Sequence, residues 1–311
     1  MARHATQNRR SDSGTDRRLF CFGLGYSASA LAESLLAEGW AVAGTARTEE
    51  GCAALRARGV AAHRYAPDHP LADPEAALAG TTHLVSSVPP EAEGDPVLRD
   101  HGTLIAQLPD LAPDLIWVGY LSTTGVYGDR DGGWVDEDSD RTPSGERGRR
   151  RVAAEDAWLA LWRHHGLPVH LFRLAGIYGP GRNALRTVLD GRARRLVKPG
   201  QVFSRIHVAD IVAVLRASIA RPAPGRAYNL CDDAAAPPQD VIAYACTLLG
   251  VEPPPDMPFD GAELSPMARS FYADNKRVRN DRIKTELGIA LAYPDHRTGL
   301  DALLDSERTR S

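Results

Sequence analysis

A glycine-containing turn between an apolar strand and an apolar helix constrains this sequence more than any other feature. Residues 19–22 (LFCF) form a short apolar run, which is typical of a buried parallel strand. The run leads directly into residues 23–28 (GLGYSA), and alanines and leucines at helical spacing follow as far as Gly39. Residues 40–44 (WAVAG) then read as a second strand. These segments form one βαβ unit that contains the pattern G-x-G-x-x-A.

The residues of this turn match what a dinucleotide site requires. Gly23 permits the tight turn, Gly25 lets the backbone approach a pyrophosphate, and Ala28 is small enough for the helix to pack on the strand. The helix N-terminus offers free N–H groups and the positive end of its dipole to the phosphates. The sequence therefore predicts cofactor contacts from Gly23, Gly25, Tyr26, Ser27 and Ala28; the alternative is an ordinary tight turn.

The end of the second strand distinguishes NADP from NAD. An NAD site places Asp or Glu there to hold the ribose 2′-OH. In this chain Arg47 follows the strand, and the first acidic residue is Glu49. A guanidinium at this position can pair with a 2′-phosphate. We therefore expect NADP as the cofactor, with NAD as the alternative if Arg47 is only a solvated loop residue.

Strands and helices continue to alternate after this unit. A helix is expected near residues 50–58, and strands near 61–65, 83–87 and 115–121. This order predicts an α/β fold with a Rossmann-type doubly wound parallel sheet. Because ligands lie beyond the carboxyl ends of the strands in such sheets, we expect Ser86, Ser87 and Val88 to line the cofactor.

Three later stretches carry a family resemblance: residues 122–128 (STTGVYG), 173–181 (RLAGIYGPG) and 206–211 (IHVADI). Together with the glycine turn, and in this order, they resemble the extended short-chain dehydrogenase/reductase family. Its best-known members are NAD-dependent epimerases and dehydratases that act on nucleotide sugars. The resemblance implies a Rossmann domain with a small C-terminal substrate lobe, and it adds Ala175 and Ile177 to the expected cofactor contacts.

The resemblance also suggests how the chain is divided. We expect an NAD(P)-binding Rossmann domain over residues 18–178 and a substrate lobe over most of residues 179–311, with segments near 205–232 returning to the sheet. Residues 1–17 are polar and basic and lack the apolar segment of a signal peptide, so they are expected to form a disordered tail.

The catalytic residues of the family are only partly retained. Thr123 occupies the position whose hydroxyl binds the reacting oxygen of the substrate. The family then uses a Tyr as acid/base group and a Lys four residues later, whose charge makes the phenolate accessible. Alignment of residues 151–155 (RVAAE) with the family's K-x-A-A-E puts Arg151 at the Lys position and Arg147 at the Tyr position. A guanidinium is no proton donor at neutral pH.

Other groups in the chain could take part in the chemistry instead. Tyr127 ends the segment that presents Thr123, Asp136 and Glu137 lie in a glycine-rich loop, and His207 follows an expected sheet element. For each of them the alternative is a structural role. A Y-x-x-x-K pattern does occur from Tyr272 to Lys276, but it lies more than a hundred residues beyond the place where the family has its Tyr and Lys. It is interpreted as a chance match.

Composition excludes several classes of protein. The net charge is −3, which argues against a nucleic-acid or anionic-membrane surface. The four Cys are scattered, which indicates reduced thiols in a cytoplasmic protein, and no metal-ligand pattern is found. No apolar stretch approaches the length of a membrane span. A cluster of arginines at residues 182–195, with Arg205, could grip a phosphate or carboxylate or could be a solvated face.

Three functions are compatible with these features. The leading hypothesis is an NAD(P)-dependent oxidoreductase or epimerase-like enzyme that acts on a hydroxyl or carbonyl group of a small molecule. The second is a catalytically silent NADP-binding sensor or regulatory protein, and the third is a nucleotide-sugar epimerase, which Gly176 disfavours because the family often has Asn there. The family often dimerises through the helix that would hold residues 151–162, so a homodimer is expected unless its apolar side chains pack on the sheet.

Overall fold

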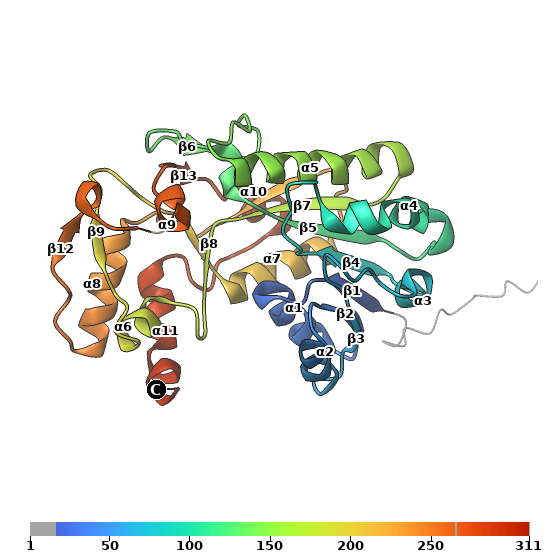
Figure 1. Cartoon of the computed structure of the whole chain (residues 1–311), viewed down its shortest axis with the longest axis horizontal. Coiled ribbons are helices and arrows are strands. Elements are labelled where there is room, and N and C mark those ends of the chain that lie inside the picture. Colours follow the sequence, from blue (N-terminus) through green and yellow to red (C-terminus); the bar gives the residue numbers. More distant parts are fainter. Residues whose placement is uncertain (1–16, 265, 311) are drawn as a thin grey trace, which may run out of the picture.

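The centre of the molecule is one parallel sheet of seven strands (Figure 1). The computed structural model describes residues 17–264 and 266–310, so the expected N-terminal tail lies outside the described residues except for Arg17. The strand order is β3-β2-β1-β4-β5-β7-β11, and it reverses between β1 and β4. This is a doubly wound sheet, and the predicted fold class is confirmed. The strands are β1 (Arg18–Phe22), β2 (Ala41–Ala46), β3 (Ala61–Arg64), β4 (His83–Ser86), β5 (Trp117–Thr123), β7 (Val169–Leu174) and β11 (Ala227–Leu230).

Helices cover both faces of this sheet (Figure 1). On one face lie α1 (Tyr26–Leu36), α2 (Glu49–Arg56), α7 (Val208–Ala220) and α10 (Asp281–Leu287). On the other face lie α3 (Pro74–Leu78), α4 (Pro96–Leu111) and α5 (Glu146–His165).

The first strand shows why its sequence is apolar throughout. Successive side chains of a strand point to opposite faces of the sheet. Leu19 and Cys21 pack into the core under α1 and α7, whereas Phe20 and Phe22 pack into the core under α4 and α5. Because helices cover both faces, all four side chains are fully buried. A strand of this kind has no polar face, as expected for a parallel sheet.

A smaller lobe is built mainly from segments that follow β7, at one side of the sheet (Figure 1). Its strands pair as β8 with β10 and as β9 with β12. A separate apolar cluster joins α6, α8 and α11. The lobe contains β8 (Gly176–Tyr178), α6 (Ala184–Leu189), β9 (Arg195–Val197), β10 (Arg205–His207), α8 (Pro238–Leu249), β12 (Asp256–Pro258), η3 (Phe259–Gly261), α9 (Pro266–Phe271) and α11 (His296–Thr309). Between β10 and α8 the chain passes through α7 and β11, which belong to the layers of the main sheet.

The charged residues 276–288, which end at Gly288, predict a helix, but the helix in the structure is shorter. A helix over residues 276–288 is wrong at its start, because β13 (Arg277–Val278) is extended and pairs with β6 (Trp134–Val135). The side chain of Asn280 then donates to the carbonyl of Cys231 and to Asp233. These contacts delay the helix, so α10 begins at Asp281.

A buried carboxylate joins α5 to the sheet. Glu155 of α5 is fully buried and accepts a hydrogen bond of 2.6 Å from the hydroxyl of Ser122 in β5. It also forms an ion pair of 2.9 Å with Arg173 of β7, which is itself buried, and one of 3.1 Å with Arg141. Every oxygen of the carboxylate is therefore satisfied inside the protein.

The Glu155 pair gives a direct stability test. Replacing Glu155 by Gln leaves the Arg173 guanidinium buried without a counter-charge, so we expect a loss of about 3–5 kcal/mol in the free energy of unfolding. Glu146→Gln on the same helix is the matched control, because Glu146 is exposed and, among the described residues, forms ion pairs only with Arg149 and Arg150 at the surface. Urea unfolding measures both variants. Equal, small losses would contradict the structural role assigned to Glu155.

Candidate functional site

The glycine turn at the end of β1 is held by its neighbours in the sheet. Gly23 has φ +79°, a backbone conformation that favours glycine. Its N–H donates to the hydroxyl of Thr45 in β2 at 2.8 Å, and its carbonyl accepts from the Ser87 hydroxyl after β4. A Cβ at Gly23 would lie 3.1 Å from the side chain of Val88. The turn is therefore fixed from both neighbouring strands and has no room for a side chain.

Open space lies in front of the first helix. Gly25 is the N-cap of α1, and no side chain caps the helix. A Cβ added at Gly25 would meet no atom within 4 Å. Ser27, in the first turn, is buried, and its hydroxyl has no hydrogen-bond partner among the described residues. Uncapped N–H groups, an orphaned hydroxyl and free space at a glycine fit a pyrophosphate, so the residues present suit a dinucleotide.

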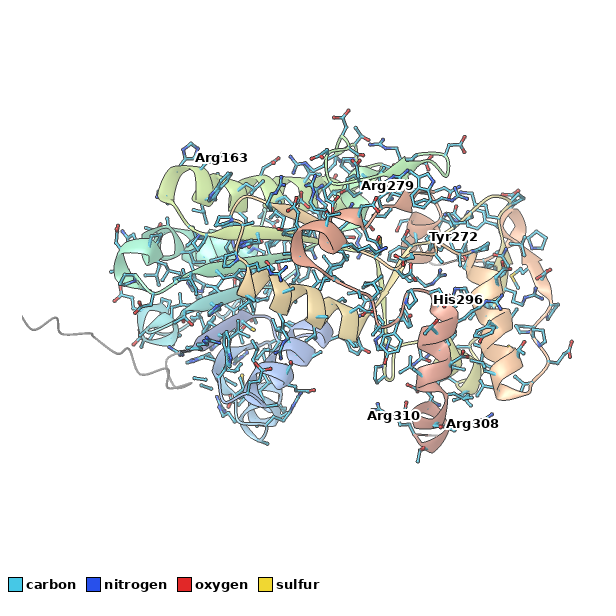
Figure 2. The ribbon with its side chains drawn as sticks, turned by 180° about the vertical axis from the view of Figure 1, so that it is seen from behind. Arg163, Tyr272, Arg279, His296, Arg308 and Arg310 are labelled. Atoms are coloured by element: carbon cyan, nitrogen blue, oxygen red, sulfur yellow. The ribbon has the colours of Figure 1, made fainter. Side chains whose placement is uncertain are left out.

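Tyr26 connects this turn to the small lobe. Its hydroxyl donates to the carbonyl of Pro180 at 3.1 Å, and the guanidinium of Arg182 lies 5.6 Å from its ring centre. The end of α11 reaches the same place, since a Cβ at Gly181 would lie 3.4 Å from a guanidinium nitrogen of Arg310 (Figure 2). Sequence reasoning missed Arg310, because only the packing of α11 brings it here.

A second arginine, Arg64, lies near Arg47 at the carboxyl edge of the sheet. Arg47 is exposed and forms no hydrogen bond or ion pair with the part of the chain that the structure describes. Arg64, the last residue of β3, is aligned with Ala46 of β2, one residue before Arg47. Two arginines thus lie at the ends of neighbouring strands. Only the register of β2 and β3 shows that Arg64 is close to Arg47, so the sequence alone could not predict it.

The other expected cofactor contacts lie close to the turn but differ in exposure. Ser87 and Val88 touch Gly23, as described above. Ser86 is fully buried and, like Ser27, has a hydroxyl with no hydrogen-bond partner among the described residues. Ala175 is buried, with its N–H donating to Leu230, whereas Ile177 of β8 is only partly buried. We keep Ser87, Val88 and Ile177 as the better-placed members of this set.

Thr123 ends β5 and keeps a hydroxyl proton to donate. Its oxygen accepts from the N–H of Gly125 at 3.1 Å, in the turn of η2 (Thr124–Tyr127). Arg151 of α5 donates to the Tyr120 hydroxyl at 3.0 Å and to the Leu121 carbonyl at 2.9 Å. Arg151 is therefore anchored on β5 at Tyr120 and Leu121, two to three residues before Thr123, the residue expected to bind substrate.

Another arginine of α5, Arg147, lies against the small lobe. Arg147 precedes Arg151 by four residues, so the two share one face of the helix. The Arg147 guanidinium lies 5.6 Å from the ring centre of Phe271, at the end of α9. The helix face that carries the acid/base pair in the resembling family thus carries two permanent cations here.

Tyr127 is placed for a structural role. It is fully buried, and its hydroxyl donates to Asn229 at 2.7 Å and accepts from Arg173 at 2.9 Å. Burial raises its pKa to about 12. A phenol that has both hydrogen-bond capacities used inside the core has no free position for a substrate proton, so Tyr127 is left out of the chemistry proposed below.

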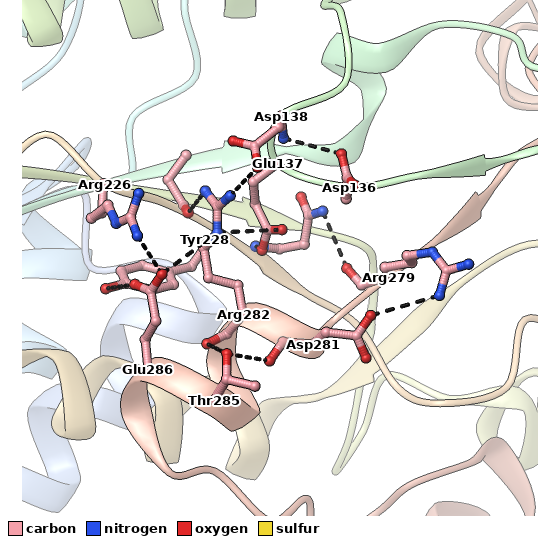
Figure 3. Close-up of polar contacts among 12 residues, drawn as sticks. Asp136, Glu137, Asp138, Arg226, Tyr228, Arg279, Asp281, Arg282, Thr285 and Glu286 are labelled. Atoms are coloured by element: carbon pink, nitrogen blue, oxygen red, sulfur yellow. Dashed lines mark hydrogen bonds and ion pairs between the residues drawn. The ribbon is translucent and has the colours of Figure 1, made fainter.

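The acidic residues of the glycine-rich loop hold the loop in place (Figure 3). Glu137 is nearly inaccessible; it accepts from the N–H of Asn229 at 2.7 Å and lies 3.8 Å from the guanidinium of Arg282. Burial raises the pKa of Glu137 above its ordinary value. Asp136 accepts from the Ser139 hydroxyl at 2.8 Å. Both carboxylates therefore face loop and sheet partners.

The late Y-x-x-x-K pattern does not form a dyad. The helix α9 ends at Phe271, so Tyr272 and Lys276 do not share a helical turn. The Tyr272 ring packs against Phe203 and Phe259, whereas the Lys276 ammonium donates to the Gly128 carbonyl at 2.8 Å. The two side chains have separate partners.

The described residues contain neither a metal site nor a membrane-spanning helix. No cluster of three or more His, Cys, Asp or Glu side chains in that part of the chain could hold a metal ion. None of the helices in that part combines the length and apolar character needed to cross a membrane.

His207 provides a pH test of this region. Its ring is buried against Tyr293 and Tyr178, with one nitrogen accepting from the Ala209 N–H at 3.2 Å. Burial lowers its pKa from 6.5 to about 4. The unfolded chain then binds the proton more readily, so the stability that His207 contributes is complete above pH 6.5 and is lost as pH falls towards 4.

We expect the His207 ring signals in an NMR titration to stay those of a neutral imidazole from about pH 7.5 to about pH 5. His207→Gln identifies the signals. A protonation midpoint near the ordinary value of 6.5 would contradict the buried placement.

Comparisons with known proteins agree with this architecture. No family model matches the chain. Solved structures of two enzymes share the fold at low identity. The dTDP-glucose 4,6-dehydratase of Bacillus anthracis, in complex with NAD, has a TM-score of 0.73 at 16% identity, over 94% of this chain and 97% of that one. The UDP-glucuronic acid 4-epimerase of Bacillus cereus, in complex with UDP-glucuronic acid and NAD, has a TM-score of 0.73 at 15% identity, over 94% of this chain and 100% of that one. They are an epimerase and a dehydratase, the enzyme types that the motifs resemble.

Two proteins are similar in sequence as well. A conserved protein of unknown function from Silicibacter pomeroyi DSS is 52% identical, with a TM-score of 0.84 over 93% of this chain and 99% of that one. Protein YeeZ of Escherichia coli (strain K12) is 30% identical over 293 residues, which cover 90% of this chain and 97% of YeeZ. The chain therefore belongs to the same family as protein YeeZ.

Proposed function

We propose that this protein is an NADP-dependent oxidoreductase or epimerase-like enzyme that acts on a hydroxyl or carbonyl group of a small molecule. The open space at Gly25, before the uncapped N-terminus of α1, carries this proposal. The space lies beside the reversal of strand order between β1 and β4, where doubly wound sheets bind ligands. The two enzymes that share the fold are recorded with NAD, which supports a nicotinamide dinucleotide.

Each end of the cofactor has residues suited to it. The first-turn N–H groups of α1 and the Arg182 guanidinium suit the pyrophosphate. Arg47 and Arg64 suit a 2′-phosphate, which is the basis for preferring NADP. Arg151 uses one guanidinium nitrogen on Tyr120 and Leu121, which leaves its other N–H groups for the nicotinamide ribose.

The chemistry would centre on Thr123. The nicotinamide, when bound, would supply a hydride donor and acceptor. The Thr123 hydroxyl would donate a hydrogen bond to the reacting oxygen and so orient the carbon that bears it. The charges of Arg147 and Arg151 would favour negative charge developing on that oxygen.

Cofactor preference can be measured by calorimetry. We expect Arg47→Ala and Arg64→Ala each to weaken NADP and NADPH binding by roughly tenfold or more, because each removes a charged hydrogen bond worth about 1.5–3 kcal/mol. The affinities for NAD and NADH should stay unchanged, since these lack the 2′-phosphate. Arg163→Ala, at the far end of α5, is the control (Figure 2). Equal losses for all four dinucleotides would contradict the assignment of the two arginines.

A catalytically silent NADP sensor is the second candidate, and one observation favours it. Within the described residues, no Tyr, His, Lys, Cys or carboxyl side chain forms a hydrogen bond with Thr123, whose one bonded partner is the Gly125 N–H. A sensor would bind NADPH and NADP with clearly different affinities and turn over no alcohol or carbonyl compound. Steady-state assays on such compounds, beside the calorimetry, separate the two candidates.

A nucleotide-sugar epimerase is the third candidate and has less support. The family's Asn position is Gly176 here, and a Cβ there would lie 3.3 Å from the Ser204 carbonyl and 3.6 Å from the Arg205 stem. The Ser204 carbonyl is the tight contact, so a side chain at this position would require the backbone at Ser204 to shift slightly, whereas the Arg205 stem lies at ordinary van der Waals distance.

A homodimer through α5 stays part of the proposal. A surface hollow between α5 and α4 is lined by Leu98, Gly102, Thr103, Ala106, Gln107, Ala157, Leu161 and His165. Trp158 is not available for a partner, because it is fully buried with its indole N–H donating to Asp95 at 3.0 Å.

A further inference from the structure

A second cavity lies in the small lobe, away from the glycine turn. Its volume is about 300 Å³, within the usual range for small-molecule sites. It lies among α6, α8, α11 and the paired strands β8 and β10, with His296 at the first turn of α11 (Figure 2). The lining residues are Tyr178, Ala184, Arg194, Arg205, Pro238, Val241, Ile242, His296 and Leu300.

The cationic side chains that line this cavity are two arginines, Arg194 and Arg205, and none of the lining residues is acidic. His296 also lines it, but burial lowers its pKa and so favours the neutral ring. Arg194 has no hydrogen bond or ion pair with any described residue, although its neighbours in sequence do. Arg205 donates from one nitrogen to the carbonyls of Phe203 at 2.9 Å and Ala236 at 3.1 Å. Its remaining N–H groups have no partner in the part of the chain that the structure describes.

The contrast with neighbouring arginines is informative. Arg186 and Arg192 form ion pairs with Asp190, at 2.7 Å and 2.5 Å. Arg195 pairs with Asp256 at 3.0 Å. The arginine cluster that the sequence shows is thus mostly neutralised by local carboxylates. Arg194 is the member that faces the cavity and lacks such a partner.

The nearest acids do not neutralise the cavity. Asp232 is buried, and one of its oxygens accepts from the backbone N–H of Arg205 at 3.3 Å. Burial raises the pKa of Asp232 to about 8, so this carboxyl is mostly uncharged at neutral pH. Asp240 and Asp295 lie near His296, but neither lines the cavity. Asp295 instead accepts from the backbone N–H of Thr298 at the start of α11.

We infer that this cavity binds the carboxylate or phosphate group of a small molecule through Arg194 and Arg205. Guanidinium groups match both anions in geometry and charge. The apolar body of the ligand would lie against Val241, Ile242 and Leu300. Arg205 also passes beside Gly176, at the start of β8, which follows β7. On the proposed function, the ligand of this cavity would be the substrate. Only this last step rests on the proposed function.

The test measures anion binding to the cofactor-free protein. Calorimetry at constant ionic strength, with chloride as the reference anion, measures the binding of three probes, one at a time: inorganic phosphate, phenyl phosphate and benzoate. Phosphate alone reports a free-phosphate site, and the two ring-bearing probes report whether the apolar wall contributes. The variant is Arg194→Ala, since Arg194 is exposed and its removal breaks no described hydrogen bond. Arg192→Ala is the matched control, two residues away and paired with Asp190 outside the cavity.

We expect wild-type protein to bind at least one ring-bearing probe more tightly than inorganic phosphate. Arg194→Ala should weaken that binding roughly tenfold or more, because a charged hydrogen bond is lost, and Arg192→Ala should leave it unchanged. No binding of any probe would overturn the inference, as would equal weakening by both variants, which would show general attraction to a basic surface. Dinucleotide binding is measured separately, so failure here and failure of the proposed function give different results.

Discussion

The buried carboxylate of Glu155 fixes α5 against the end of β5, where the proposed reacting end of the site lies. It binds Ser122 next to the end of β5 and Arg173 in β7, so α5 cannot slide along the sheet without breaking a buried ion pair. Arg173 in turn donates a hydrogen bond to the hydroxyl of Tyr127. This contact fixes the position of η2, the turn that follows Thr123. The positions of Thr123 and of the Arg147–Arg151 face of α5 both follow from this network.

The glycine turn and the small lobe are tied together in a similar way. Tyr26 bonds to Pro180, and Glu307 of α11 accepts from the backbone N–H of Gly181. Asp210 of α7 accepts from two backbone N–H groups, at residues 292 and 293, just before α11. The segment around Pro180 and Gly181 therefore lies beside the glycine turn, and the lobe is anchored to the main sheet. These contacts fix the position of the small lobe relative to the proposed dinucleotide site.

The parts of this structure that depend on local pattern were predictable from the sequence. Burial on both faces of the sheet makes β1 a continuous apolar run, and the spacing of Gly23, Gly25 and Ala28 located the turn to the residue. Partnerships between distant residues were not predictable. The sequence shows Tyr127 and Glu137 as candidate acids or bases, but only the packing of Asn229 and Arg173 makes them structural.

The same limit applies to charge. Arg64 beside Arg47 required the register of β2 and β3, and the arginine cluster at residues 182–195 could not be divided into paired and unpaired members before its carboxylate partners were known. A run of guanidinium groups in sequence shows neither which ones are neutralised nor which face a cavity.

The measurement that tests the central claim most directly is dinucleotide binding by Gly25→Val, compared with wild type by calorimetry and thermal unfolding. A Cβ at Gly25 meets open space and the residue has φ −82°, so the fold should tolerate the side chain and the unfolding temperature should stay close to that of wild type. The same side chain would fill the place of the pyrophosphate, so NADPH binding should disappear. If the folded variant binds NADPH as wild type does, or if wild type binds no dinucleotide, the glycine turn is not a cofactor site.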